Sequence, residues 1–310
     1  MLAAAYADMT VQGGPTVVEL RSGRSMPMIG LGTYLQSPEQ AQTAVLCALK
    51  LGYRAIDTAE FYANHVGIGN AIKESGVPRS EIFITDKISP GGGGAPVKTA
   101  DEVIAIVKTN MNLLQVSFLD QILIHHAFAG KDARVTHYRA LLELKHQGIV
   151  GEVGVSNFSE LHIAEIEAAG LELPSTNQIE VHPLCTQRQL RQYLKTKGIV
   201  AVAYSSLAPI STWRAQPGQA SSKTGADTEL VKAKIKAIAE RLGISHAKLM
   251  LSWAVQQGIP ILPKSDSSER IADNFDLGST VIPEEDMETL DSLDANRCFA
   301  WPIGNPLSAP

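Results

Sequence analysis

The sequence contains 310 residues, of which 45% are hydrophobic and 19% charged, as is typical of a soluble globular protein with a sizeable core. Its formal charge of −5 leaves no basic excess for binding nucleic acid or an anionic membrane. The three cysteines lack the spacing of a disulfide framework or a metal site, so we expect no metal and a reducing, cytoplasmic location.

The N-terminal part is predicted to add a tail and a hairpin to the main fold. Residues 1–16 lack both the basic start and the apolar run of a secretory signal, so we expect a loose tail. Residues 17–29 predict a short β-hairpin, in which two apolar arms flank Ser22 and Gly23, and Pro27 limits the second arm. No later segment approaches the length of a membrane span.

From residue 29 onward, short apolar runs alternate with segments of helical periodicity. The predicted strands are 29–33, 54–57, 82–88, 120–125, 150–156, 176–180, 199–205 and 259–263. Helices are predicted between them, for example at 37–52, 100–114 and 135–148. The first of these helices has the clearest ends, since Ser37 can cap it, Pro38 suits its first position and Gly52 can terminate it.

The alternation of strands and helices indicates the fold class. A chain of this length fits either two ordinary domains or one large barrel. Near-continuous apolar strands that alternate with amphipathic helices call for a parallel sheet buried on both faces. Eight such units favour an α/β fold that closes into a (β/α)8 TIM barrel over a doubly wound sheet. We therefore predict a single domain over residues 1–310.

Three segments fall outside this alternation. Residues 89–99 are rich in glycine and residues 208–229 are polar, and loops of such length are usually functional or disordered. The last segment, from Asp294 to Pro310, is interrupted by prolines, so we expect a loop rather than a helix. We predict that this C-terminal tail lies over a face of the barrel, at its mouth.

Polar side chains gather where the predicted strands end. The residues at these ends are Asp57, Glu60, Tyr62, Asp86, Lys87, His125, Ser156, Asn157, Gln178, Glu180, Tyr204, Ser205, Lys264 and Ser265. Successive strand ends lie about one strand–helix unit apart, and a barrel brings such ends to one mouth, where the active sites of this fold lie. Any single Asp, Ser or Asn at a strand end can equally cap the next helix. A shared site at the barrel mouth explains the whole set better than helix capping alone does.

Four of these residues predict a site for reducing a carbonyl group. A tyrosine with a pKa of about 10 is a poor acid near neutrality, but an adjacent ammonium lowers this pKa, and Lys87 could supply that charge to Tyr62. Asp57 could pair with the buried lysine and fix its position. His125 can donate a hydrogen bond to a carbonyl oxygen. Together they would form a proton donor and an oxyanion site.

The same strand ends resemble those of the aldo-keto reductase family over nearly the whole chain. The matching segments are LGYRAIDTAEFYAN, ITDKI, LDQILIH, GVSNF, NQIEVHP, AYSSLAP and ILPKSDSSERIADN. The resemblance implies a (β/α)8 barrel that binds a nicotinamide cofactor, usually NADP(H), and reduces aldehydes and ketones. It also assigns the family's catalytic tetrad to Asp57, Tyr62, Lys87 and His125.

The resemblance further implies the residues that hold the cofactor. Ser156, Asn157 and Gln178 would hold the carboxamide of the nicotinamide, and Tyr204 would stack on its ring. Gly32, Thr33 and Tyr34 would line the cofactor near the substrate mouth. Ser205 and Leu207 would also contact the cofactor. At the adenosine 2′-phosphate the implied residues are Lys264, Ser265 and Arg270, with Asn274 near the adenine. A lysine, a hydroxyl and an arginine around one phosphate also make chemical sense, although the same segment could be a solvated helix start. The loop 208–229 would close over the pyrophosphate as a lid.

The sequence departs from the family pattern at three positions. His126 stands where members often carry Trp, His65 where they carry Glu, and Ser206 where they carry Pro. His126 would change the shape and polarity of the substrate pocket. The candidate pocket walls, each of which could equally be packing, are Tyr34, His126, Trp213, Cys298, Phe299 and Trp301. Short segments also resemble microbial reductases of conjugated polyketones and ketolactones.

The leading functional hypothesis is a monomeric NADPH-dependent carbonyl reductase that acts on small molecules, with Tyr62 as the proton donor. A cofactor-sensing regulatory subunit with little turnover is the alternative from another class. An NAD-preferring dehydrogenase that runs in the oxidative direction is disfavoured by Lys264 and Arg270, which suit a phosphate.

Overall fold

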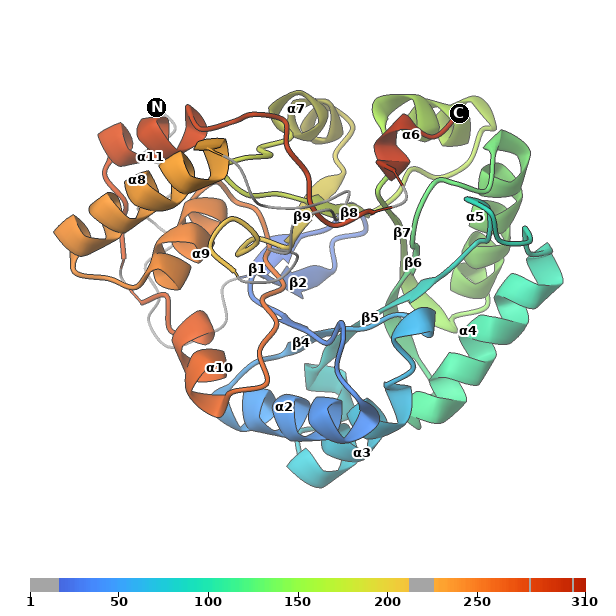
Figure 1. Cartoon of the computed structure of the whole chain (residues 1–310). Helices are drawn as coiled ribbons and strands as arrows, with labels where there is room; N and C mark the ends of the chain where they lie inside the picture. Colours follow the sequence, from blue (N-terminus) through green and yellow to red (C-terminus); the bar gives the residue numbers. More distant parts are fainter. Residues whose placement is uncertain (1–16, 212–225, 279, 303) are drawn as a thin grey trace.

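The computed structural model describes residues 17–211, 226–278, 280–302 and 304–310. In this part of the chain one parallel sheet of seven strands runs in sequence order. Its strands are β3 (Leu31–Gly32), β4 (Ala55–Asp57), β5 (Phe83–Ile88), β6 (Leu119–Ile124), β7 (Val150–Ser156), β8 (Thr176–Glu180) and β9 (Val200–Tyr204). Because each strand pairs in parallel with the next along the chain, all their carboxyl ends meet at one side (Figure 1).

The eighth strand position closes the sheet without forming a regular strand. Ile261 makes one parallel bridge to Ile29 and another to Ala203, and so joins the first strand position to the last. The expectation of a regular strand at 259–263 is therefore wrong. Pro260 and Pro263 lack the N–H groups that a continuous ladder needs. The sheet nevertheless closes, and the predicted (β/α)8 barrel is confirmed.

A hairpin closes the opposite end of the barrel. Strands β1 (Val17–Glu19) and β2 (Ser25–Pro27) pair antiparallel, as predicted. Between them, the amide of Leu20 donates to the carbonyl oxygen of Arg24. Side chains of the hairpin form a separate apolar cluster with residues at the starts of β4, β5 and β9. Its buried members are Leu20, Met26, Ala55, Phe83 and Val202. The hairpin thus seals the end away from the carboxyl ends of the strands.

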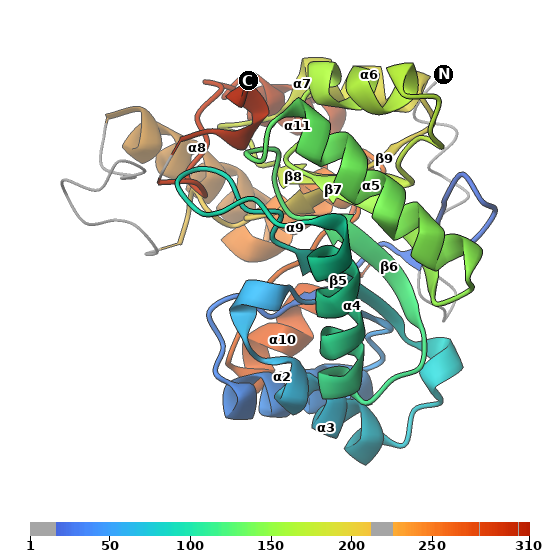
Figure 2. The ribbon, with the colours of Figure 1, turned by 90° about the vertical axis from the view of Figure 1, so that its right-hand side faces the viewer.

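Helices surround the sheet, and Figure 2 shows α4 and α5 on the outer face of neighbouring strands. The helices are α2 (Pro38–Leu51), α3 (His65–Ser75), α4 (Ala100–Leu114), α5 (Lys131–His146), α6 (Glu160–Ala168), α7 (Arg188–Thr196), α8 (Ala226–Leu242), α9 (His246–Gln256), α10 (Ser268–Phe275) and α11 (Glu284–Asp291). The predicted ends of α2 are confirmed, with a capping box at Ser37 and a left-handed Gly52 after it. Helix α5 begins earlier than predicted.

Two predicted loops have different outcomes. Residues 89–99 contain no helix or regular strand, only a bridge between Gly92 and Ala95. The loop predicted at 208–229 is too long, because α8 already begins at Ala226. Most of that segment, including residues 212–225, lies outside the described residues, and so does the predicted tail at 1–16.

The C-terminal tail crosses the mouth of the barrel as predicted. Glu180, at the end of β8, is buried and accepts hydrogen bonds from the amides of Phe299 (2.8 Å) and Ala300 (2.9 Å). Beyond them the tail forms one 3-10 turn, η4 (Pro306–Ser308), where we expected no helix of any kind. None of the helices described is both long and apolar enough to span a membrane. The single-domain organisation stays a prediction.

Candidate active site

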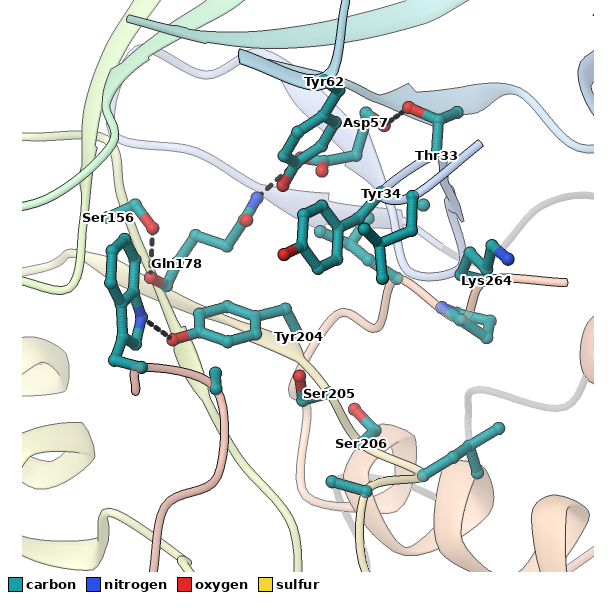
Figure 3. Close-up of a pocket in the computed structure, with 18 of the residues that line it drawn as sticks. Thr33, Tyr34, Asp57, Tyr62, Ser156, Gln178, Tyr204, Ser205, Ser206 and Lys264 are labelled. Carbon is teal, nitrogen blue, oxygen red and sulfur yellow. Dashed lines mark hydrogen bonds between the residues drawn. The ribbon is translucent and has the colours of Figure 1, made fainter. Parts of the chain in front are cut away.

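The carboxyl ends of the strands open into a cavity of about 510 Å³ (Figure 3). The predicted site residues that line it are Gly32, Thr33, Tyr34, Asp57, Tyr62, His125, Ser156, Asn157, Gln178, Tyr204, Ser205, Leu207, Lys264 and Trp301. Lys87, near the end of β5, is fully buried and is not part of this lining. The barrel therefore brings most of the predicted site to one place.

A buried ion pair forms the floor of this cavity. Lys87, near the end of β5, is wholly buried, and its ammonium donates to the Asp57 carboxylate (2.5 Å) and to the carbonyl oxygen of Thr58 (2.8 Å). Gln178 donates to the other Asp57 oxygen (2.7 Å). Burial raises the pKa of Asp57, against the opposing effects of Lys87 and of the hydrogen bond from Gln178. Both charges are thus partnered, as a buried pair requires.

Tyr62 lies directly over this ion pair. It ends a 3-10 turn, η2 (Glu60–Tyr62), that follows β4, and the Lys87 ammonium is 5.0 Å from the centre of its ring. Burial raises the pKa of Tyr62 well above its usual value of 10.0, and the nearby Asp57 charge raises it further. The expected net lowering of this pKa is wrong, because burial outweighs any lowering by the nearby Lys87 ammonium. Tyr62 therefore keeps its proton at neutral pH.

His125 completes this group from the end of β6. Its ring centre lies 5.8 Å from that of Tyr62 and 6.0 Å from that of Trp301. Burial lowers the pKa of His125 well below its usual value of 6.5, and the charges of Lys87 and His126 act in the same direction. A neutral imidazole carries one N–H, so His125 can donate a single hydrogen bond to a ligand at the mouth.

Amide and hydroxyl groups form one wall of the cavity. Asn157 donates to the carbonyl oxygen of His125 (3.0 Å) and to the Ser156 hydroxyl (2.9 Å), which in turn donates to the carbonyl oxygen of Gln178 (2.8 Å). The Tyr204 hydroxyl donates to the Asn157 side chain (2.6 Å). Trp301 donates to the same hydroxyl (2.9 Å). The chain of hydrogen bonds holds these side chains in place and ties the tail to the cavity.

Two residues of this wall have strained backbones. Asn157, which follows β7, has a φ of 60°, and Ser205, which follows β9, has a φ of 54°. Non-glycine residues rarely adopt this left-handed region. Leu35, which also lines the cavity, shares it with a φ of 61°, but so does Gln115 after α4, so the conformation is not specific to the cavity.

The predicted phosphate-binding residues lie at the other side of the cavity. Figure 3 draws Lys264 far from Ser156 and Gln178, and Lys264 is the member of this group that lines the cavity. Ser265 is buried beside it, Arg270 is exposed on α10, and Asn274 is buried on the same helix. The cationic side chain of Lys264 is thus separated from the uncharged side chains of Ser156 and Gln178.

The candidate substrate-pocket residues divide into several groups. Tyr34 and Trp301 line the main cavity, and His126 packs against Trp301 with ring centres 5.5 Å apart. Burial lowers the pKa of His126 to about 4, so its ring is neutral. Cys298 instead lines a second cavity of about 220 Å³, beside Trp301. Phe299 is buried against His182 and lines neither cavity. Trp213 lies outside the described residues.

The structure adds residues that the sequence pattern did not assign to the site. Phe61 is 56% exposed at the mouth, and its ring centre lies 5.4 Å from that of His125. Its place directly before Tyr62 could have indicated this role. His65 contacts Asp86 (3.0 Å), and Asn110 donates to the same carboxylate (2.8 Å). This buried group adjoins Lys87, because Asp86 directly precedes that lysine in β5.

Known proteins resemble this chain over most of its length. The model of the Aldo/keto reductase family matches residues 28–295. Glyoxal reductase of Bacillus subtilis strain 168 is 36% identical over 281 residues, which cover 90% of this chain and 93% of that protein. Methylglyoxal reductase DkgA of Escherichia coli strain K12 is 31% identical over 284 residues, which cover 91% and 95%.

Solved structures of aldo-keto reductases also resemble this chain. An aldo-keto reductase from a deep-sea metagenome library of the Medee basin superposes with a TM-score of 0.80 at 30% identity, and covers 92% of this chain and 97% of its own. A Bombyx mori aldo-keto reductase in complex with NADP gives 0.82 at 26% identity, and covers 93% and 95%. The barrel, the cavity at its carboxyl end and these matches lead to one conclusion. The chain belongs to the aldo/keto reductase family and is an oxidoreductase that reduces carbonyl groups.

Proposed function

We propose that this protein reduces small aldehydes or ketones to alcohols with NADPH, and that Tyr62 supplies the proton. The observation that carries the proposal is the convergence of a phenol, an ammonium, a carboxylate and an imidazole at one cavity. Tyr62 and His125 face the opening, while the ion pair of Lys87 and Asp57 lies beneath them. The relatives named glyoxal and methylglyoxal reductase suggest small dicarbonyl compounds as first substrates to test.

The side chains of the cavity fit such a cofactor. The wall around Asn157 and Gln178 presents amide groups suited to a carboxamide, and Tyr204 offers a ring that an aromatic group can stack on. Lys264 and Arg270 supply positive charge on the other side for the 2′-phosphate. When bound, NADPH supplies the hydride equivalent that adds to the carbonyl carbon.

The protein's own residues place the substrate and handle its proton. His125 donates its N–H to the carbonyl oxygen and directs that oxygen toward Tyr62. The phenol then gives its proton to the same oxygen as negative charge develops there. Lys87 stabilises the resulting phenolate and is itself held by Asp57 and Thr58. Aromatic rings at the mouth exclude water from the reacting atoms.

The pKa shifts predict a simple pH dependence. Because burial holds the pKa of His125 well below 6.5 and that of Tyr62 well above 10.0, neither group titrates in the neutral range. We expect kcat/KM for reduction to be nearly constant between about pH 6 and about pH 9, and to fall only as Tyr62 loses its proton at higher pH. Initial rates at saturating NADPH test this. A steep change near neutrality would show that another group controls protonation.

A spectrophotometric assay tests the proposed function directly. Purified protein with NADPH should consume the reduced cofactor when glyoxal, methylglyoxal or another small dicarbonyl is added. No loss of the reduced-cofactor absorbance across aldehydes, dicarbonyls and α-ketolactones would contradict the proposal. Tight NADPH binding without any turnover would instead favour a regulatory, cofactor-sensing role. The monomeric state and the cytoplasmic location stay predictions.

A further inference from the structure

Lys264, the lysine proposed to bind the cofactor phosphate, already forms an ion pair with the carboxylate of Asp266. Asp266 lies 2.7 Å from the Lys264 ammonium through one oxygen. Its other oxygen accepts a hydrogen bond from the Gln36 side chain, also at 2.7 Å. Gln36 donates in addition to the carbonyl oxygen of Ser265 (3.2 Å), so the two residues that follow the lysine are tied to the same side-chain amide.

The position of Asp266 is fixed by buried groups. Gln36 is buried, and its backbone carbonyl accepts a hydrogen bond from the side chain of Asn64. The backbone N–H of Gln36 donates to the carbonyl oxygen of Thr33, the residue that follows β3. The Asp266 carboxylate is therefore attached to the barrel mouth and not free to move as an ordinary surface side chain. Burial raises the pKa of Asp266, but the hydrogen bonds from Lys264 and Gln36 outweigh burial and lower this pKa below its ordinary value. Asp266 is therefore ionised at neutral pH.

We propose that Asp266 competes with the 2′-phosphate of the cofactor for Lys264, and so reduces the preference of this protein for NADP over NAD. The inference rests on the proposed function, in which Lys264 binds that phosphate. A phosphate that reaches the lysine must either displace the carboxylate or share the ammonium with it. NAD carries a hydroxyl at this position and meets no such repulsion.

The expected size of the effect follows from the exposure of the pair. The side chains of Lys264 and Asp266 are 32% and 44% exposed, so solvent screens their interaction strongly. A carboxylate roughly 5 Å from a phosphate dianion in water weakens binding by about tenfold. The repulsion should fall further as salt is raised, because the Debye length shortens to about 3 Å at 1 M ionic strength.

Asp266→Asn tests the proposal with a minimal change. The amide keeps the size of the side chain and an oxygen for the Gln36 hydrogen bond, but removes the charge. Dissociation constants for NADP⁺ and NAD⁺ are measured by isothermal titration calorimetry with the whole protein. We expect NADP⁺ to bind about tenfold tighter at low salt, with NAD⁺ changed by less than about twofold, and the gain to shrink at high salt. Glu269→Gln, an exposed carboxylate in the first turn of α10, is the matched control and should give no comparable gain.

A third variant separates this inference from the proposed function. Lys264→Ala should weaken NADP⁺ binding more than NAD⁺ binding if the lysine holds the phosphate. If it does, but Asp266→Asn leaves the NADP⁺ constant unchanged or tightens both cofactors equally, the inference about Asp266 is overturned and the phosphate assignment stands. If Lys264→Ala affects both cofactors alike, the phosphate assignment fails and the inference fails with it.

Discussion

Replacing Tyr62 by Phe is expected to lower kcat for carbonyl reduction by about 10³-fold, while the dissociation constant for NADP⁺ changes little. The phenol O–H is the proposed proton donor, and general acids of this kind contribute roughly 10²- to 10⁴-fold. The ring itself remains, so its contacts with Tyr34 and with the Lys87 ammonium are kept. Steady-state rates with a dicarbonyl substrate, together with calorimetric titration of NADP⁺, give both quantities.

Tyr34→Phe is the matched control for this experiment. Tyr34 lines the same cavity, and its ring centre lies 5.0 Å from that of Tyr62, so the change removes a hydroxyl from the same surroundings. We expect its effect on kcat to be at least tenfold smaller than that of Tyr62→Phe. Equal losses in the two variants, or loss of cofactor binding in Tyr62→Phe, would assign Tyr62 a structural role and remove the proton donor from the proposal.

The features that depend on local sequence were the predictable ones. The ends of α2 follow from Ser37, Pro38 and Gly52, whose preferences act within one helical turn. The strands follow from apolar runs, and the shared mouth follows from the spacing of polar strand ends. The Lys87–Asp57 contact was predictable from charge, since a buried lysine at a strand end requires a partner.

Features that depend on three-dimensional surroundings were not predictable. The shift of the Tyr62 pKa depends on burial and on the nearby charge of Asp57, and a sequence motif specifies neither the burial nor the distance between the two side chains. Phe299 and Trp301 are two residues apart in an irregular tail, so no periodicity tells which of them faces the cavity. The attachment of the tail to Glu180, and of Asp266 to Gln36, joins segments far apart in the chain.

The Lys87–Asp57 pair should also control stability in a pH-dependent way. Lys87→Met keeps a long side chain but leaves the Asp57 carboxylate buried without its cation. Removing one partner of a buried pair costs roughly 3–5 kcal/mol, so we expect the free energy of unfolding to fall by about that amount at neutral pH. Chemical denaturation measures this loss. The double variant Asp57→Asn with Lys87→Met removes both charges and should regain a large part of the lost free energy of unfolding.

The sign of the pH effect identifies the cause of that loss. Burial already raises the pKa of Asp57, and without Lys87 it must rise further. A carboxyl group whose folded-state pKa exceeds its unfolded value of about 3.9 stabilises the fold most at low pH, and loses that contribution as pH rises through the folded pKa. The stability gap between Lys87→Met and the unaltered protein should therefore be smaller at about pH 5 than at about pH 8. A gap that does not change with pH would mean that the loss comes from packing around residue 87, and that the carboxylate of Asp57 does not depend on the lysine for its charge.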